Sequence, residues 1–134
     1  MRVFIFACIH NAGRSQMSAA LFNKYVDSTR ACAVSAGTNP ANQVHPVVLD
    51  AMQELGIDLS NAKPQKLTTE LAQGAEMLIT MGCGEECPHV PGLRRADWPL
   101  PDPKGQGIET VRTTRAEIEK RILQLLKEES LLAK

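Results

Sequence analysis

The sequence has few aromatic residues and no excess of either charge. Phenylalanine, tyrosine and tryptophan make up 4% of the 134 residues, and 15 basic side chains balance 15 acidic ones. Proteins that bind nucleic acid or a membrane surface usually carry a basic excess, so we expect neither partner. An anion site in this chain would therefore depend on a few local residues.

The chain also lacks a long apolar run, an internal repeat and a low-complexity tract. Val3–Ile9 is apolar but too short to span a membrane, and it lacks the flanks of a secretory signal. We expect one domain, residues 1–134, that is cytoplasmic and monomeric. Its four cysteines should then stay reduced, which favours catalytic or metal-binding roles over structural disulfides.

Short apolar segments alternate with amphipathic ones, which predicts an α/β fold. Strands are predicted at Val3–Ile9, Ala31–Gly37, Glu76–Met81 and, as a short edge strand, Arg94–Trp98. Helices are predicted from Ser15 to just before Asp27, over Pro46–Leu55, over Thr68–Ala72 and over Ile108–Leu126, followed by a frayed tail to Lys134. This alternation implies a parallel sheet covered by helices on both faces, in three layers.

A cysteine and an arginine flank a small-residue loop between the first strand and the first helix. The stretch reads Cys8-Ile9-His10-Asn11-Ala12-Gly13-Arg14-Ser15. Loop amides and the helix dipole at such a junction form a cradle for an anion, and the same cradle stabilises a thiolate.

Three residues of this stretch have side chains or backbone properties suited to binding an anion beside a thiolate. The Arg14 guanidinium can bind two oxygens of a tetrahedral oxyanion, and Ser15 is placed to donate a hydrogen bond to the Cys8 sulfur. Gly13 suits a loop that needs positive φ or a close backbone approach. We therefore expect Cys8 to be a nucleophile that attacks an oxyanion held by residues 9–14. The alternative is an inert cysteine at a strand end with an unrelated surface arginine.

The leaving oxygen of such a reaction needs a proton. Asp102 lies between Pro101 and Pro103, which fix its backbone, and it is our candidate for the acid. Asp97 is the alternative acid, and a simple turn aspartate is the alternative role for Asp102.

Cys83 and Cys87 follow the third predicted strand. In a helical turn their Cα atoms would be about 6 Å apart, within disulfide range. With His89 they could instead bind zinc, although structural zinc normally takes four ligands, so we predict no metal.

The pattern Cys8-x5-Arg14-Ser15 with a late Asp102-Pro103 resembles the low-molecular-weight protein tyrosine phosphatases. Further motifs resemble the arsenate reductases built on that phosphatase fold, and the similarity extends to about Leu126. These motifs are His10-Asn11, Gln16-Met17, Ser35-Ala36-Gly37-Thr38, Thr80-Met81-Gly82-Cys83, Cys87-Pro88 and Asp97-Trp98.

The resemblance implies a four-stranded parallel sheet and the reduction of arsenate to arsenite. By analogy, Cys83 is the first resolving thiol and Cys87 the second, with no bound cofactor. The implied electron donor is an external thiol, either thioredoxin or glutathione with glutaredoxin.

The chain departs from those relatives at two points. The gap between Cys83 and Cys87 is shorter than in the thioredoxin-coupled members. Ala19 stands where some relatives carry a glutamate that helps bind potassium, so we predict no potassium site. A protein tyrosine phosphatase is the alternative function, but Lys104-Gly105 follow Asp102-Pro103 where those enzymes place aromatic side chains.

Overall fold

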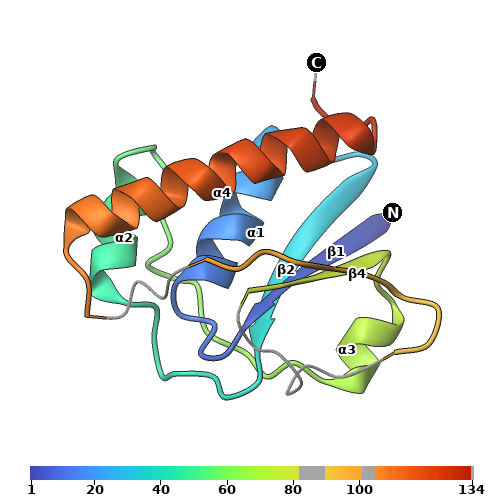
Figure 1. Ribbon diagram of the computed structural model, residues 1–134, viewed down its shortest axis with the longest axis horizontal. Coiled ribbons are helices and arrows are strands. Elements are labelled where there is room, and N and C mark those ends of the chain that lie inside the picture. Colours follow the sequence, from blue (N-terminus) through green and yellow to red (C-terminus); the bar gives the residue numbers. More distant parts are fainter. Residues whose placement is uncertain (82–89, 101–104, 134) are drawn as a thin grey trace.

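The computed structural model describes residues 1–81, 90–100 and 105–133. Its sheet has four parallel strands in the order β2-β1-β3-β4 (Figure 1). The strands are β1 (Arg2–Cys8), β2 (Ala31–Gly37), β3 (Met77–Thr80) and β4 (Arg94–Asp97). The helices are α1 (Arg14–Tyr25), α2 (Pro46–Gln53), α3 (Thr69–Gln73) and α4 (Ile108–Glu128). The predicted α/β class and four-stranded parallel sheet are confirmed.

Strand β1 lies inside the sheet, and both of its faces are buried. Phe4 and Phe6 point into one hydrophobic cluster while Ile5 and Ala7 point into another, because successive side chains of a strand alternate between faces. The Phe22 ring of α1 packs on Phe4 and Phe6, with ring centroids 5.0 and 5.8 Å apart. Helices α1, α2 and α4 cover this face and α3 lies on the other, which gives the predicted three layers (Figure 1).

The order of the strands brings several carboxyl ends to one edge of the sheet. From β1 the chain passes through α1 to β2 on one side, and it later returns to β3 on the other side. In register, Cys8 pairs with Gly37, and Thr80 pairs with both Ala7 and Asp97. Ligands of open parallel sheets bind at such an edge, beside the strand where the connection changes direction.

Most predicted boundaries are confirmed to within two residues. Helix α1 begins at Arg14, one residue earlier than predicted, and α2 ends at Gln53, two residues before Leu55. Gly56 then turns the chain with φ +75°, a conformation that a side chain disfavours. The predicted cap of α3 is also confirmed, since the Thr68 hydroxyl accepts a hydrogen bond from the Leu71 amide at 3.1 Å.

The prediction of a frayed C-terminal tail is wrong through residue 133. The side chain of Leu131 is fully buried in the main core. The Asp27 amide donates to the Leu131 carbonyl at 2.7 Å, and the Ala133 amide donates to the Tyr25 carbonyl at 2.9 Å. Burial of one leucine and two backbone hydrogen bonds therefore hold the tail against the end of α1.

Among the described residues, no helix is both long enough and apolar enough to cross a membrane.

An ion-pair network joins the end of α4 to the edge of the sheet opposite Cys8. Arg2 contacts Glu76 at 3.1 Å, Arg94 contacts Glu129 at 2.8 Å, and Arg2 also pairs with Glu129. Hydrogen bonds from Arg94 and then Arg2 stabilise the carboxylate and lower the pKa of Glu129 to about 2. The network therefore depends on an ionised Glu129.

We predict that Glu129→Gln lowers the free energy of unfolding by about 1 kcal/mol near neutral pH, because partly exposed ion pairs contribute no more than this. The folded pKa of Glu129 lies below its ordinary value of 4.5. The contribution of the Glu129 carboxylate to the free energy of unfolding is therefore complete above pH 4.5 and is lost as the pH falls towards 2. Urea unfolding of both proteins should show a difference at neutral pH that shrinks in acid.

The matched control is Glu128→Gln, since the neighbouring Glu128 carboxylate accepts from the Gln124 amide. This control should change stability little at either pH. A difference for Glu129→Gln that stayed constant down to pH 2 would contradict the prediction.

Candidate functional site

The predicted nucleophile lies where β1 ends beneath the start of α1. Cys8 is the last residue of β1, it is almost fully buried, and it is not in a disulfide. Residues 9–13 form the connection, and α1 begins at Arg14. The structure thus brings Cys8, the loop and Arg14 together, as predicted. We call residues 8–14 the cysteine loop.

Hydrogen bonds hold six consecutive carbonyl groups of the cysteine loop, and all six go to groups beyond it. Their distances range from 2.8 to 3.2 Å. The pairs, carbonyl first, are Cys8 with Thr38 N, Ile9 with Asn39 N, His10 with Ala41 N, Asn11 with Gln16 Nε2, Ala12 with His45 N, and Gly13 with Met17 N. The segment from Thr38 to His45, predicted only as a connecting loop, therefore supports the cysteine loop from outside.

This arrangement determines where the loop amides point. In a trans peptide the C=O of one residue and the N–H of the next point in opposite directions, and the described chain has no cis peptide bond. Because the carbonyls of residues 8–13 point outward, the N–H groups of residues 9–14 point to the inner side. Successive inward amides are a concave anion site, and the N-terminus of α1 adds partial positive charge to it.

Gly37 allows the cysteine loop to lie close to the end of β2. A Cβ atom at this position would come within 2.5 Å of the Ile9 carbonyl oxygen and 2.9 Å of the Asn11 nitrogen. Real Cβ atoms essentially never approach backbone atoms so closely, so any other residue here would displace the loop.

A directed chain of hydrogen bonds ends on the Cys8 sulfur. The backbone N–H of Gln65 can only donate, so the Asn11 atom that it meets at 2.9 Å must be the oxygen Oδ1. Asn11 Nδ2 therefore faces Ser15 and donates to its Oγ at 2.8 Å. Ser15 Oγ lies 2.9 Å from Cys8 Sγ, which confirms the predicted contact, and its hydroxyl hydrogen remains available for donation to the sulfur.

Positive φ occurs in this loop at Asn11, not at Gly13. Asn11 has φ +51°, whereas Gly13 has φ −143° and serves as the N-cap of α1. Of the two reasons predicted for Gly13, positive φ is therefore excluded, and a close backbone approach stays a prediction. Asparagine tolerates the left-handed region because its short polar side chain can bond nearby, and here the fully buried Asn11 does so.

The guanidinium of Arg14 is buried beside the loop. Its Nη1 donates to the Leu100 carbonyl at 2.9 Å, so it contacts the segment that follows β4. On the outer side, His10 Nδ1 lies 3.2 Å from the Asn39 carbonyl, and since a carbonyl can only accept, Nδ1 carries the proton. His10 thus fills a structural position at the loop rather than acting as a base through Nδ1.

Of the remaining predicted residues, the structure describes only Asp97. Asp97 ends β4, where one carboxylate oxygen accepts from the Thr80 hydroxyl at 2.8 Å. Asp102, Cys83, Cys87 and the alternative zinc ligand His89 lie outside the described residues. Among the described residues, no cluster of histidine, cysteine, aspartate and glutamate could hold a metal ion.

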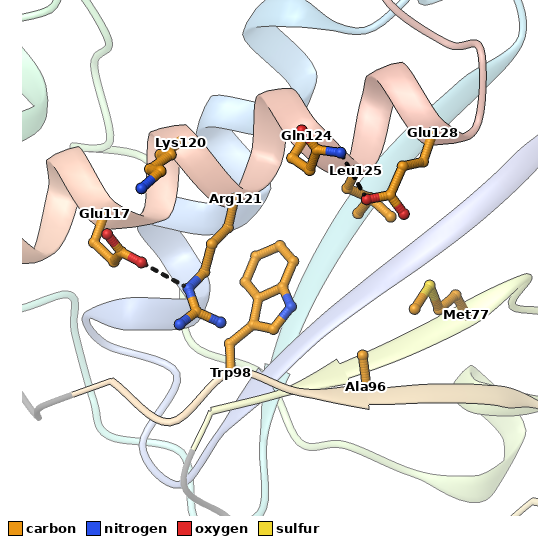
Figure 2. A pocket seen from close by; sticks show the side chains of 9 residues that line it. All are labelled: Met77, Ala96, Trp98, Glu117, Lys120, Arg121, Gln124, Leu125 and Glu128. Atoms are coloured by element: carbon orange, nitrogen blue, oxygen red, sulfur yellow. Dashed lines mark hydrogen bonds and ion pairs between the residues drawn. The ribbon is translucent and has the colours of Figure 1, made fainter.

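An apolar hollow lies apart from the cysteine loop. It has a volume of about 390 Å³ and lies between α4 and the β3–β4 edge of the sheet (Figure 2). Its base includes Met77, Ala96 and Trp98, and Arg121 lies over the Trp98 ring at 5.9 Å while pairing with Glu117 at 3.1 Å. No residue of the cysteine loop lines it.

Comparison with known proteins gives consistent matches. Residues 3–134 match the family described as "Low molecular weight phosphotyrosine protein phosphatase". The structure of a thioredoxin-dependent arsenate reductase from Corynebacterium glutamicum is similar, with a TM-score of 0.83 and 38% sequence identity. The match covers 96% of this chain and 61% of the Corynebacterium chain.

Two curated relatives are matched over nearly their whole length. An arsenate reductase from Halalkalibacterium halodurans is 35% identical over 90% of this chain and 92% of the relative. A glutaredoxin arsenate reductase from Synechocystis is 32% identical over 94% of this chain and 97% of the relative.

We predict that Gly37→Ala removes the anion site without unfolding the protein, because the new methyl group displaces Ile9 and Asn11. Bound phosphate should slow alkylation of Cys8 by iodoacetamide in the wild type but not in the variant, as measured by peptide mass spectrometry. Gly74→Ala is the matched control, since a Cβ there meets no atom within 4 Å. Retained protection by phosphate in Gly37→Ala would contradict the close-approach argument.

Proposed function

Because the chain belongs to the low-molecular-weight phosphotyrosine protein phosphatase family, we propose that it uses its cysteine loop to reduce arsenate to arsenite. The inward amides of residues 9–14 are the observation that carries this proposal. They suit a small tetrahedral oxyanion, and the loop begins at a cysteine whose sulfur lies 2.9 Å from the Ser15 hydroxyl. Arsenate reductases among the relatives support the choice of oxyanion.

In the first step the Cys8 thiolate attacks arsenic and an oxygen leaves as water. Arg14 and the loop amides hold the remaining oxygens, while Asp102 supplies a proton to the leaving oxygen. The choice of Asp102 as the acid is supported by the hydrogen bond from Arg14 to the carbonyl of Leu100, which precedes Asp102 by two positions in the sequence. The product is an adduct in which Cys8 sulfur is bonded to As(V).

In the second step Cys83 attacks the Cys8 sulfur. The sulfur–arsenic bond breaks with its electron pair on arsenic, so As(V) becomes As(III) and arsenite leaves. A disulfide between Cys8 and Cys83 remains. Cys87 then attacks Cys83, Cys8 returns as a thiolate, and an external dithiol reduces the final disulfide between Cys83 and Cys87.

The end of β3 supports a location of the relay near Cys8. The Met81 amide donates to the Ala7 carbonyl at 2.8 Å, so the chain leaves β3 next to the residue that precedes Cys8. Cys83 follows only two positions later. The relatives also support an external thiol reductant, since one is described as thioredoxin-dependent and another as a glutaredoxin arsenate reductase.

Phosphatase activity is the second candidate function, because hydrolysis needs the same loop but only one cysteine. The loop residues alone do not separate the two reactions. The two-electron reduction of arsenic separates the reactions, since it requires Cys83 and Cys87, whereas hydrolysis of a phosphate ester needs neither.

We predict that Cys8→Ser abolishes both arsenate reduction and hydrolysis of a small aryl phosphate, because both begin at its sulfur. Cys83→Ser and Cys87→Ser should each lower arsenate turnover at least 100-fold while preserving the slow hydrolysis. Cys32→Ser is the control, since Cys32 lies in β2 outside the cysteine loop, and it should retain both activities. Normal arsenate reduction by the Cys83 and Cys87 variants would refute the internal relay.

The electron donor can be identified by following arsenate-dependent NADPH oxidation. One reaction contains thioredoxin with its reductase, and the other contains glutathione, glutaredoxin and glutathione reductase. An internal disulfide between Cys83 and Cys87 is a substrate suited to a dithiol, so we predict faster turnover with thioredoxin. Turnover only with the glutathione system would contradict this and would show that glutathione and glutaredoxin reduce the final disulfide.

A further inference from the structure

We infer that Gln16 is a positioning residue for Cys8, which acts through Asn11 and Ser15. Gln16 is the third residue of α1, and the residue is only 6% exposed. The inference concerns the state of the Cys8 sulfur before any substrate binds. It therefore goes beyond the proposed function and can be tested without arsenate.

One nitrogen of Gln16 contacts two oxygens of a single residue. Gln16 Nε2 lies 3.1 Å from the Asn11 carbonyl oxygen and 3.2 Å from Asn11 Oδ1. A side-chain NH₂ group has two hydrogens, so it can donate one to each oxygen. A backbone carbonyl can only accept, which requires the nitrogen of the Gln16 amide to be on this side.

These contacts fix the orientation of the Asn11 amide. Gln16 Nε2 and the Gln65 backbone N–H both donate to Oδ1, so two donors favour the observed orientation. If the Asn11 amide turned by 180°, its Nδ2 would meet these two donors and Oδ1 would meet Ser15. An N–H group facing two donors is unfavourable, the more so because Asn11, Ser15 and Gln16 are buried.

The orientation of Asn11 decides where the Ser15 hydrogen goes. In the observed orientation Asn11 Nδ2 donates to Ser15 Oγ, which leaves the hydroxyl hydrogen available to Cys8 Sγ, 2.9 Å away. In the turned orientation Oδ1 would compete for that hydrogen, and Cys8 would lose its donor. Gln16 thus keeps the Ser15 hydroxyl available to the Cys8 sulfur without touching that sulfur.

An uncharged hydrogen-bond donor at position 16 also suits the electrostatics of the N-terminus of α1. Helix α1 has no acidic residue in its first turn and no side-chain cap at Gly13. The positive end of the helix is thus left for the thiolate and the bound anion. A carboxylate at position 16 would oppose both, whereas the Gln16 amide holds Asn11 with no negative charge.

The test is a double-mutant cycle read out by the alkylation rate of Cys8. Gln16→Met keeps the approximate size of the side chain and removes both donors, and Ser15→Ala removes the final donor. Each should slow reaction of Cys8 with iodoacetamide near neutral pH by about five- to tenfold, the effect of one lost hydrogen bond. If Gln16 acts through Ser15, the double variant should be no slower than Ser15→Ala alone.

Two further variants keep the test decisive. Gln16→Glu replaces the donor by an acceptor of the same shape, so it favours the turned Asn11 amide, and it should slow alkylation more than Gln16→Met. If Gln16→Met fails to fold, the cycle is run with Gln16→Leu instead, which also removes both donors and adds no charge. Gln124→Met, on an exposed part of α4, is the matched control and should alkylate at the wild-type rate.

Two results would overturn the inference. The first is an unchanged alkylation rate in a folded Gln16 variant. The second is an additive cycle, with a slowing in the double variant equal to the product of the single effects, because a general loss of packing at Gln16 would act independently of Ser15. Failure of arsenate reduction alone would leave the inference standing, since alkylation does not involve that reaction.

Discussion

The candidate site depends on the outward direction of six neighbouring carbonyl groups. A peptide plane has two polar ends, so fixing every C=O on the outside turns every following N–H to the inside. The partners that fix them come from the Thr38–His45 segment and from the first turn of α1. An anion site can thus form in a chain with no net charge, because it uses backbone dipoles and one arginine.

The sheet places these partners within reach of each other. Cys8 and Gly37 end adjacent parallel strands in register, so the cysteine loop and the Thr38–His45 segment leave the sheet side by side. The missing side chain at Gly37 lets them touch, and the buried Phe4 and Phe6 hold β1 against α1 behind them. The burial of β1 on both faces therefore supports the geometry of the site as well as the stability of the fold.

Sequence patterns predicted the strands and helices well because each carries a local signal. The apolar run at Val3–Ile9, the proline at position 46 and the Thr68 cap each act within one element. The cysteine loop was predictable for the same reason, since strand, loop and helix are continuous in sequence. The contact between Ser15 and Cys8 followed from that continuity.

The features that the sequence did not predict all depend on contacts between distant segments. Nothing local indicates that Gln65 fixes the Asn11 amide, 54 positions earlier, or that Gly37 is needed beside Ile9. The buried Leu131 near the C-terminus likewise binds the end of α1 only through the tertiary fold. Positive φ at Asn11 was missed because glycine is the usual signal, and here a buried asparagine is held by its own hydrogen bonds.

Among the described residues, the buried side chains that connect to the Cys8 sulfur through hydrogen bonds are neutral. Asn11, Ser15 and Gln16 are buried and carry no charge, and their hydrogen bonds run in one direction from Gln16 through Asn11 to the Ser15 hydroxyl, which contacts the Cys8 sulfur. A buried carboxylate in their place would need a counter-ion and would compete with the bound anion for the helix N-terminus. Uncharged donors avoid that competition, which is why the same loop can stabilise a thiolate and still accept an oxyanion.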